Sequence, residues 1–235
     1  MTTTAGDPPS LATLLELLGS QDLGERLRAV NKARELSPPE TLTLLQQAVA
    51  DENARVRYAA ISQLGTLAAR GIDPATLLPI LQQSLREDPE FDVRAAAAAA
   101  LGDLKQPQAL ADLLEAYQRE TEWLVRFSIV AALGELGNPA AFDTLVQVLQ
   151  EGNELLTTAA AAALGDLGDP RAIPYLEPLI ASDDWQLRYR VCIALSQLGT
   201  EAAYPGLARL AQDSQEQVAA CARAALASLA AKGAL

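Results

Sequence analysis

The segment VRYAAISQLGTL (residues 56–67) recurs along the chain in diverged copies. The clear copies are VRAAAAAALGDL at 93–104, VRFSIVAALGELG at 125–137, LTTAAAAALGDLG at 156–168 and LRYRVCIALSQLG at 187–199. Weaker copies are ERLRAVNKAREL at 25–36 and VAACARAALASL at 218–229. We name the second residue of each copy its marker position, which is filled in order by Arg26, Arg57, Arg94, Arg126, Thr157, Arg188 and Ala219. Most markers lie about 31 residues apart, and one such period along a chain indicates a repeat array rather than unrelated domains.

Within each copy the apolar residues follow the spacing of an α-helix. In the first clear copy, one stripe is formed by Val56, Ala60, Ile61, Leu64 and Leu67. This pattern predicts a helix with one buried face. Several copies end in a glycine that suits a left-handed helix cap, namely Gly137, Gly168 and Gly199.

A shorter helical pattern precedes most copies and often opens with proline, which is tolerated in the first helical turn. Examples are PETLTLLQQAVA at 39–50, PATLLPILQQSLRE at 74–87 and PAAFDTLVQVLQ at 139–150. In PRAIPYLEPLIA at 170–181, Pro174 and Pro178 lie deeper and predict a bent or shortened helix. Each unit therefore consists of two helices, which cannot bury their apolar faces without stacked neighbours.

About seven stacked units predict an all-α fold, a right-handed α-α superhelix whose marker helices line the concave face. We expect one solenoid domain over residues 9–235, preceded by a flexible N-terminal tail at 1–8. The step from copy two to copy three is longer than the others, around AARGIDPAT at 68–76. This insertion predicts a longer loop that disturbs the superhelix.

The composition argues against several classes of site and partner. The formal net charge is −12 and no lysine/arginine run occurs, which disfavours a nucleic-acid partner. The chain has no histidine, which excludes a Cys/His zinc site and a Ser/His/Asp triad within it, and no glycine-rich phosphate loop occurs. The N-terminal MTTTAGDPPS is polar and no apolar run is long enough to span a membrane. We therefore expect a cytoplasmic protein without membrane insertion.

Six of the chain's ten aromatic residues occupy two positions of the repeat. Three residues before the marker stand Phe91, Trp123 and Trp185, and one residue after it stand Tyr58, Phe127 and Tyr189. The two positions are four residues apart, so both members of a pair share one helix face. These side chains either seal the groove between adjacent units or form a strip on the concave face that contacts a partner. Tryptophan, tyrosine and arginine are the types enriched at binding hot spots.

The marker arginines have a structural explanation. An acidic residue six positions upstream can cap the marker helix, and the arginine can pair with that acid or with the acid of the neighbouring unit. Arg190 has no such explanation, because copies two to five hold small residues at its position. These residues are Ala59, Ala96, Ser128 and Ala159. Arg190, together with Arg126 and Arg188, therefore joins the aromatic residues as a candidate for partner binding.

An acid, an arginine six positions later and a closing Ala-Leu-Gly resemble HEAT repeats of the phycobilisome-lyase type. The acid–arginine pairs are Asp51 with Arg57, Asp88 with Arg94 and, as a conservative variant, Glu120 with Arg126. The run LLGSQDLGERLRAVNKARELSP at 17–38, followed by DENARVRYAAISQLGTLA at 51–68, resembles the cyanobacterial phycobilisome-degradation proteins of the non-bleaching B type.

The resemblance implies a HEAT-repeat solenoid at the phycobilisome that binds phycobiliproteins and promotes detachment of their bilin chromophores. The implied partners are phycocyanin or allophycocyanin subunits and other phycobilisome degradation factors. Two alternatives stay open: a subunit of a phycobilin lyase that attaches bilins to phycobiliprotein cysteines, and a non-catalytic protein-binding scaffold. No metal is expected, and no cofactor beyond a transient phycocyanobilin ligand.

A bilin is an open-chain tetrapyrrole with a long π-system and two propionates. Aromatic faces can stack on it, and Arg126, Arg188 or Arg190 can pair with its carboxylates. The sequence identifies no catalytic residue. Asp183 and Asp184 are candidates for helix capping or for proton donation to a bound bilin. Cys192 is either a thiol that accepts a bilin or, like Cys221, a small buried residue in a reducing compartment.

Overall fold

The structure, a computed structural model, describes residues 9–231. Within this range it contains fourteen α-helices and no β-strand, which confirms the predicted all-α class. The helices are α1 (Leu11–Leu18), α2 (Leu23–Lys32), α3 (Pro38–Ala48), α4 (Ala54–Leu64), α5 (Pro74–Glu87), α6 (Phe91–Leu104), α7 (Ala109–Arg119), α8 (Trp123–Leu136), α9 (Phe142–Gln150), α10 (Glu154–Leu167), α11 (Ile173–Leu176), α12 (Trp185–Leu198), α13 (Tyr204–Leu210) and α14 (Glu216–Ala231). The predicted tail at 1–8 lies outside the described residues.

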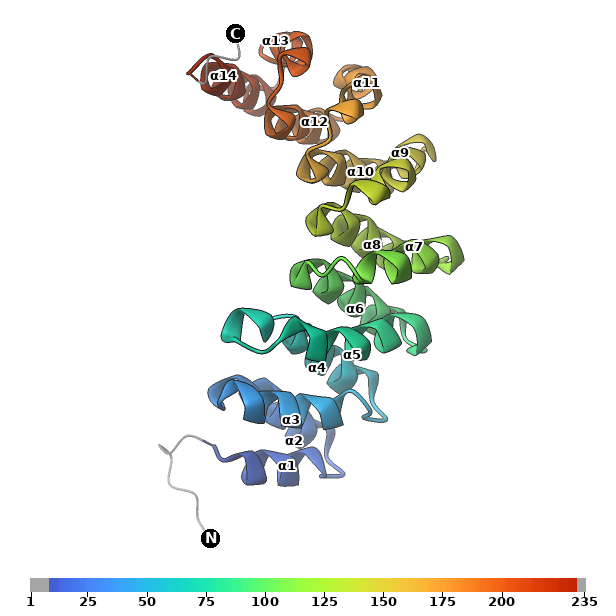
Figure 1. The fold of residues 1–235 in the computed structure, drawn as a ribbon, viewed down its shortest axis with the longest axis vertical. Helices are drawn as coiled ribbons and strands as arrows, with labels where there is room; N and C mark the ends of the chain where they lie inside the picture. Colours follow the sequence, from blue (N-terminus) through green and yellow to red (C-terminus); the bar gives the residue numbers. More distant parts are fainter. Residues whose placement is uncertain (1–8, 232–235) are drawn as a thin grey trace. The chain divides into compact units, whose positions relative to one another are not determined.

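The helices form consecutive pairs, one pair for each of the seven sequence copies (Figure 1). The second helix of each pair carries the marker position and packs against its counterparts in neighbouring pairs. Thus α4 contacts α2 and α6, and α12 contacts α10 and α14. The two-helix repeat read from the sequence is therefore confirmed as the unit of the fold.

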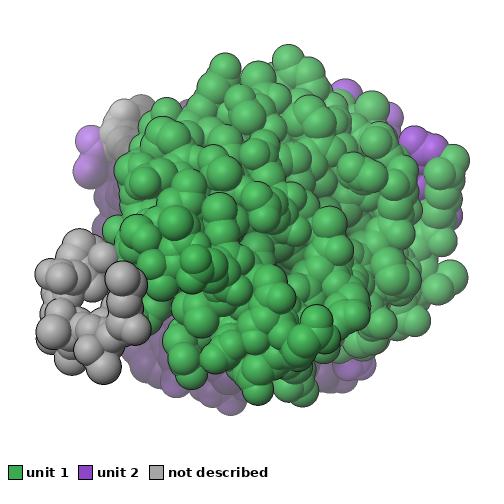
Figure 2. All heavy atoms as spheres, turned by 90° about the horizontal axis from the view of Figure 1, so that it is seen from below, with its two compact units in different colours: residues 1–112, 119–128 green, residues 113–118, 129–235 purple. Residues whose placement is uncertain are grey.

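The chain divides into two compact units (Figure 2). Unit 1 comprises residues 1–112 and 119–128, and unit 2 comprises residues 113–118 and 129–235. The division passes through α7 and α8. The single solenoid domain and its concave face, which would extend over both units, remain predictions.

The apolar stripe of the marker helix forms the core, as predicted. In α4 and the turn that follows, Val56, Ala60, Ile61, Leu64 and Leu67 are completely buried. Complete burial of a leucine or isoleucine removes its apolar surface from water and contributes roughly 1.5–3 kcal/mol. The helix is held by this face, because its opposite face carries exposed polar residues such as Arg55 and Ser62.

The glycine of the Ala-Leu-Gly motif marks a close approach of successive marker helices. In unit 2, a Cβ added at Gly134 would lie 2.6 Å from the Cα of Ala163, and one added at Gly165 would lie 2.7 Å from the Cα of Ala194. Backbone this close leaves room only for hydrogen at the glycine. The glycines that close the helices have a different role, the predicted left-handed cap. This role is confirmed, because Gly168 and Gly199 have left-handed φ angles of 71° and 60°, and so does Gly137 at 64°.

Two departures from the regular repeat follow from proline and from the insertion. As predicted, Pro174 and Pro178 shorten the first helix of their pair: α11 ends at Leu176 and the chain continues as a 3-10 segment, Glu177–Ala181. The inserted residues lengthen the connection between α4 and α5, and α5 itself has 14 residues against 11 in α3. Arg70 ties this connection to the preceding repeat, since its Nη2 donates to the carbonyl of Leu36 at 2.7 Å.

The marker arginines form a ladder between repeats. Arg57 donates from Nε and Nη2 to the carboxylate of Asp88 in the next repeat, at 2.7 and 2.9 Å. Its Nη1 donates to the carbonyl of Asp51, the acid of its own repeat, at 3.0 Å. Arg57 therefore binds both acids that the sequence offered as alternatives, through the side chain of Asp88 in the next repeat and the backbone carbonyl of Asp51 in its own repeat. The same arrangement joins Arg94 to Glu120, while Arg26 pairs with Asp51 and Arg188 with Asp213.

The upstream acids also cap the turn that leads into each marker helix. The Oδ1 of Asp51 accepts from the amide of Asn53 at 2.8 Å, and that of Asp88 accepts from the amide of Glu90 at 2.9 Å. One carboxylate thus fixes the start of its own helix and binds the arginine of the preceding repeat. This double role explains why acid and arginine recur together in the sequence.

Acidification is expected to destabilise the fold when these carboxylates become protonated. The Arg188 guanidinium beside Asp213 holds the pKa of that carboxyl below its ordinary value. Burial alone would raise the pKa of Glu120, but hydrogen bonds from Arg94 and two backbone amides outweigh it, and the pKa is lowered. A carboxylate with a lowered pKa adds stability above its unfolded pKa of about 4, and this stability is lost as the pH falls through the folded-state pKa.

Urea unfolding midpoints should therefore stay level from about pH 7 to about pH 5 and fall below that. The variant Asp213→Asn should show a smaller fall, because one of the titrating carboxylates is gone. A midpoint that stays level down to about pH 2 would contradict a stabilising role of the ladder.

Candidate functional site

A groove in unit 2 brings together three of the predicted binding residues, Trp185, Tyr189 and Arg190. It lies on three successive marker helices, α10, α12 and α14, and has a volume of about 700 Å³. We name it the α12–α14 groove; its lining consists of Thr158, Trp185, Gln186, Tyr189, Arg190, Gln217, Ala220 and Cys221. Its volume falls within the range of about 300–1,000 Å³ typical of small-molecule sites.

The repeat itself builds this groove. The lining residues on α12 are those three and two before the marker and one and two after it. Those on α14 take equivalent places around Ala219. Because Asp184 caps α12 by accepting from the amide of Gln186 at 2.9 Å, the first turn of the helix is fixed beside the groove. The N-terminal turns of neighbouring marker helices therefore present their variable positions together.

Of the predicted residues, Trp185, Tyr189 and Arg190 line this groove together. Trp185 keeps 37% of its surface exposed, Tyr189 is half-buried and Arg190 is exposed. Aromatic faces and a guanidinium on one open groove can stack on a planar ligand and bind its carboxylate. All three keep surface open to the groove, so a partner can reach them, and partner binding by these residues remains a prediction.

Arg188 lies on the same helix but is committed to the ladder. Its Nε and Nη2 bind the carboxylate of Asp213 at 2.6 and 2.8 Å, and its Nη1 donates to the carbonyls of Ser182 and Asp183 at 2.7 and 3.2 Å. These bonds account for the orientation of the guanidinium. Arg190, two residues later, is therefore the arginine of α12 that faces the groove.

The two aspartates before α12 take structural positions. Asp184 is the N-cap of the helix. The backbone carbonyl of Asp183 accepts from Arg188, and its side chain is exposed. Neither lines the α12–α14 groove.

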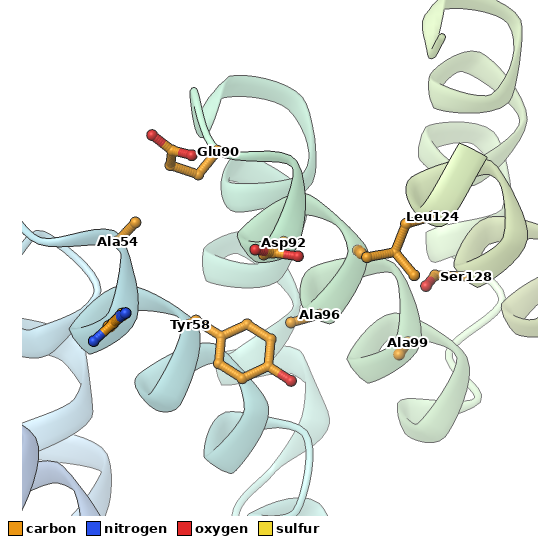
Figure 3. Close-up of a pocket in the computed structure, with 10 residues that line it drawn as sticks. Ala54, Tyr58, Glu90, Asp92, Ala96, Ala99, Leu124 and Ser128 are labelled. Atoms are coloured by element: carbon orange, nitrogen blue, oxygen red, sulfur yellow. The ribbon is translucent and has the colours of Figure 1, made fainter. Parts of the chain in front are cut away.

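A second groove, in unit 1, shows the same construction with different chemistry (Figure 3). It has a volume of about 480 Å³ and spans α4, α6 and the first turns of α8. The ring of Tyr58 extends from α4 beside Ala96 of α6 (Figure 3). The rest of its lining consists of Ala54, Arg55, Glu90, Asp92, Ala95, Ala99, Leu124 and Ser128. Where the α12–α14 groove has Arg190, this groove has alanine, and its charges are mainly acidic.

The remaining predicted residues belong to unit 1 and line neither of these grooves. Phe91, Trp123 and Phe127 are exposed by 40%, 55% and 37%. Arg126 occupies the marker position of α8 and is half-buried. A continuous strip that joins these residues to Trp185, Tyr189 and Arg190 would cross both units and remains a prediction.

Sequence reasoning missed several residues of the α12–α14 groove. The missed residues are polar or small, and none stands out within its own copy of the repeat. They are Thr158, Gln186, Gln217 and Cys221. Alignment of the copies could have identified these four residues, because each residue lies two positions before or one to two positions after a marker. Three further exposed apolar side chains outside the predicted set are Leu155, Tyr175 and Tyr204.

The two cysteines meet beside the groove. Cys192 on α12 is completely buried, and burial raises the pKa of its thiol. Its Sγ donates to the Sγ of Cys221 on α14 at 3.0 Å. The predicted burial of Cys192 is confirmed, whereas Cys221 is half-exposed and the expectation that it is buried was wrong.

Neither a metal centre nor a membrane span is found in the described part of the chain. Among residues 9–231, no three His, Cys, Asp or Glu side chains are grouped so that they could hold a metal ion. No helix in the same range is both long enough and apolar enough to cross a bilayer.

Comparisons with known proteins identify the repeat. A family model of HEAT repeats matches residues 11–101, 74–164, 122–191 and 145–230. No curated protein matches the chain. Among solved structures, the chain is similar to the complex of CpcE and CpcF of phycocyanin lyase from Nostoc sp. PCC7120, with 22% identity, a TM-score of 0.60 and coverage of 97% of this chain and 98% of that one.

Two other structures resemble the chain in the same way. YibA of Escherichia coli matches with 18% identity and a TM-score of 0.62, over 89% of this chain and 79% of that one. An engineered protein matches with 17% identity and a TM-score of 0.58, over 94% of this chain and 68% of that one. At such identities the likeness shows a common fold. Since the family model spans nearly all described residues and the helix pairs coincide with the copies, the chain belongs to the HEAT-repeat family.

Proposed function

We propose that this protein binds phycobiliproteins and promotes the loss of their bilin chromophores during phycobilisome disassembly in the cytoplasm. The α12–α14 groove carries the proposal, because it joins Trp185, Tyr189 and Arg190 on one open surface of suitable volume. The choice of a bilin as the ligand rests on the resemblance of residues 17–38 and 51–68 to phycobilisome-degradation proteins.

The chemistry of the groove suits a bilin still attached to its protein. Trp185 and Tyr189 offer aromatic faces to the conjugated rings, and Arg190 offers a guanidinium to one propionate. The thioether bond of a bilin is reversible without elaborate machinery, so binding and orientation can change its fate. In this mechanism the groove holds the chromophore in a conformation that weakens its attachment, and the protein contributes no nucleophile.

The second candidate is a subunit of a bilin lyase. It is favoured by the similarity to the complex of CpcE and CpcF of phycocyanin lyase, which extends over nearly the full length of both chains. The same groove would then present a free bilin to a phycobiliprotein cysteine. A non-catalytic scaffold is a third candidate and needs no pigment in the groove.

One mixing experiment separates these candidates. The protein is incubated with chromophorylated phycocyanin and, in parallel, with apo-phycocyanin subunit plus free phycocyanobilin, and absorbance is followed. Bleaching of the chromophorylated protein supports detachment, and new covalent pigment on the apo-subunit supports a lyase. If neither spectrum changes while a complex forms, the scaffold is supported. If no complex forms with chromophorylated phycocyanin or with the apo-subunit, phycocyanin is excluded as the partner for bilin detachment, for bilin attachment and for scaffolding.

Substitutions in the groove are expected to weaken pigment or phycobiliprotein binding. Trp185→Ala and Arg190→Ala should each raise the Kd for phycocyanin or free phycocyanobilin by about tenfold or more, because aromatic and arginine hot spots contribute on that scale. The controls are Tyr204→Ala and Arg209→Ala, which remove an exposed aromatic side chain and an exposed arginine outside this groove and outside the predicted strip. Unchanged affinity of both groove variants for both ligands would falsify the assignment of the site.

A further inference from the structure

The only two cysteines of the chain lie in contact, although 29 residues separate them in the sequence. Cys192 projects from α12 and Cys221 from α14, the marker helices of neighbouring repeats. Their sulfur atoms are 3.0 Å apart and both thiols are free. One thiol is buried, and the other forms part of the wall of the α12–α14 groove.

Packing alone does not require this pair. Where other marker helices approach closely in unit 2, alanine or glycine fills the contact, as Gly165 and Ala194 do. A buried cysteine can act as a small apolar residue without any partner. Two thiols that meet sulfur to sulfur across a repeat boundary, with one facing an open groove, form a dithiol that an oxidant can reach.

We propose that Cys192 and Cys221 form a redox modification site that reacts with low-molecular-weight disulfides of the glutathione type and closes an intramolecular disulfide. In the first step, the Cys221 thiolate attacks the small disulfide, forms a mixed disulfide and releases one small thiolate. In the second step, the Cys192 thiolate attacks the Cys221 sulfur and displaces the second small thiolate. The protein loses two protons and two electrons, and one small disulfide is reduced to two thiols.

The surroundings of the two thiols set this order. Cys221 is half-exposed in the groove, where a small molecule can approach it, whereas Cys192 is completely buried. Burial and the adjacent thiol raise the pKa of Cys192, so it is a poor first nucleophile and a slow second one. Once Cys221 is a mixed disulfide, its thiol no longer opposes ionisation of Cys192, but burial still does. Ring closure should therefore be the slower step and should accelerate as the pH rises.

The geometry of the pair favours the intramolecular product. A disulfide bond is about 2 Å long, so the sulfur atoms must approach by roughly 1 Å. The mixed disulfide places the sulfur of Cys221 within the same short reach of Cys192. Closure then links the last repeat to the one before it through a bond at the groove wall. The thiol reaction needs only the isolated protein and a small disulfide, so it is independent of the proposed function.

The test uses the full chain, reduced and freed of reductant, with glutathione disulfide at about pH 8, where an accessible thiol is partly ionised. Aliquots are quenched in acid, free thiols are labelled with a maleimide under denaturing conditions, and the chain is weighed by mass spectrometry. We expect both thiols to disappear with no retained glutathione. Two molecules of reduced glutathione should be released for each chain.

Single variants test the order of the steps. Cys192→Ser should keep one glutathione as a lasting mixed disulfide on Cys221, and Cys221→Ser should lose its remaining thiol at least about tenfold more slowly, because Cys192 is buried. Cys192→Ala is a second variant at the buried position, where alanine matches the contacts of other marker helices. Helical circular dichroism checks that each variant is folded.

Three results would overturn the proposal. The first is a wild-type chain that keeps both thiols under conditions in which Cys192→Ser is glutathionylated. The second is a lasting mixed disulfide on the wild type with Cys192 still free, and the third is a disulfide between two chains. Equal rates for Cys192→Ser and Cys221→Ser would exclude Cys221 as the point of entry.

Discussion

Arg188→Leu is expected to lower the free energy of unfolding by about 1.5–3 kcal/mol, because it leaves the largely shielded carboxylate of Asp213 without its charged donor. Only 12% of the Arg188 side chain and 7% of the Asp213 side chain are exposed. The substitution also removes the donor to the carbonyls of Ser182 and Asp183, which form the turn before α12. Urea unfolding followed by circular dichroism measures the change.

A surface arginine and the double variant provide the controls. Arg190→Leu, on the same helix but exposed, should change the free energy of unfolding by less than about 0.5 kcal/mol. Arg188→Leu combined with Asp213→Leu should cost less than the sum of the single changes, because no unpaired charge remains. If Arg188→Leu costs no more than Arg190→Leu, the ladder is a surface feature and does not hold repeat to repeat.

The ladder also shows how far sequence reasoning reaches in a repeat protein. The recurring acid and arginine predicted an electrostatic link between repeats, because an acid before the marker helix and an arginine in its first turn recur at fixed positions in copies two, three and four. Whether Arg57 binds Asp51 or Asp88 could not be decided, since one acid precedes its own helix and the other precedes the next marker helix, and a long arginine side chain can reach in either direction. The structure resolves this through two different groups, the backbone carbonyl of Asp51 and the side chain of Asp88. Periodicity predicts which residues recur, and the packing distance between helices decides which atoms meet.

The candidate site was predictable only in part, because periodicity shows which residues depart from the repeat but not which of them meet in one groove. Arg190 stood out because other copies hold small residues at its position, and the structure places it in the groove with Trp185 and Tyr189. The exposure of these aromatics depends on how much of each ring the next marker helix covers, which a single sequence does not encode. Cys221 was overlooked as a groove residue because its partner, Cys192, lies 29 residues away and occupies a different position of its own copy.

The Ala-Leu-Gly glycines were visible in the sequence, but their purpose was not. A glycine inside a helix costs roughly 0.5–1 kcal/mol relative to alanine, so its presence at the end of several copies needs an explanation. Propensity suggested helix capping, which applies to the later glycines. The earlier glycines Gly134 and Gly165 instead meet a steric requirement set by the next repeat, and only the distance between two helices reveals it.

Gly165→Ala is therefore expected to destabilise the protein, although alanine is the better helix former. The added methyl group would lie 2.7 Å from the Cα and 2.8 Å from the Cβ of Ala194, and 2.5 Å from the Oε1 of Gln197. The glutamine side chain can move away, but the backbone of α12 cannot yield without separation of α10 from α12. Overpacking of this kind costs about 1–3 kcal/mol or more. This cost outweighs the gain in helix propensity from glycine to alanine, which is roughly 0.5–1 kcal/mol.

The matched control is Gly19→Ala at the end of α1. Gly19 has a right-handed φ of −79°, and a Cβ there would meet only ordinary contacts of 3.6 and 3.7 Å. This variant should be neutral or slightly more stable, by up to about 1 kcal/mol, because only the entropy of the unfolded chain changes. Urea midpoints of the two variants should therefore move in opposite directions. If Gly165→Ala is as stable as Gly19→Ala, α10 and α12 can separate at little cost, and the close contact between marker helices is not what requires glycine at this position of the repeat.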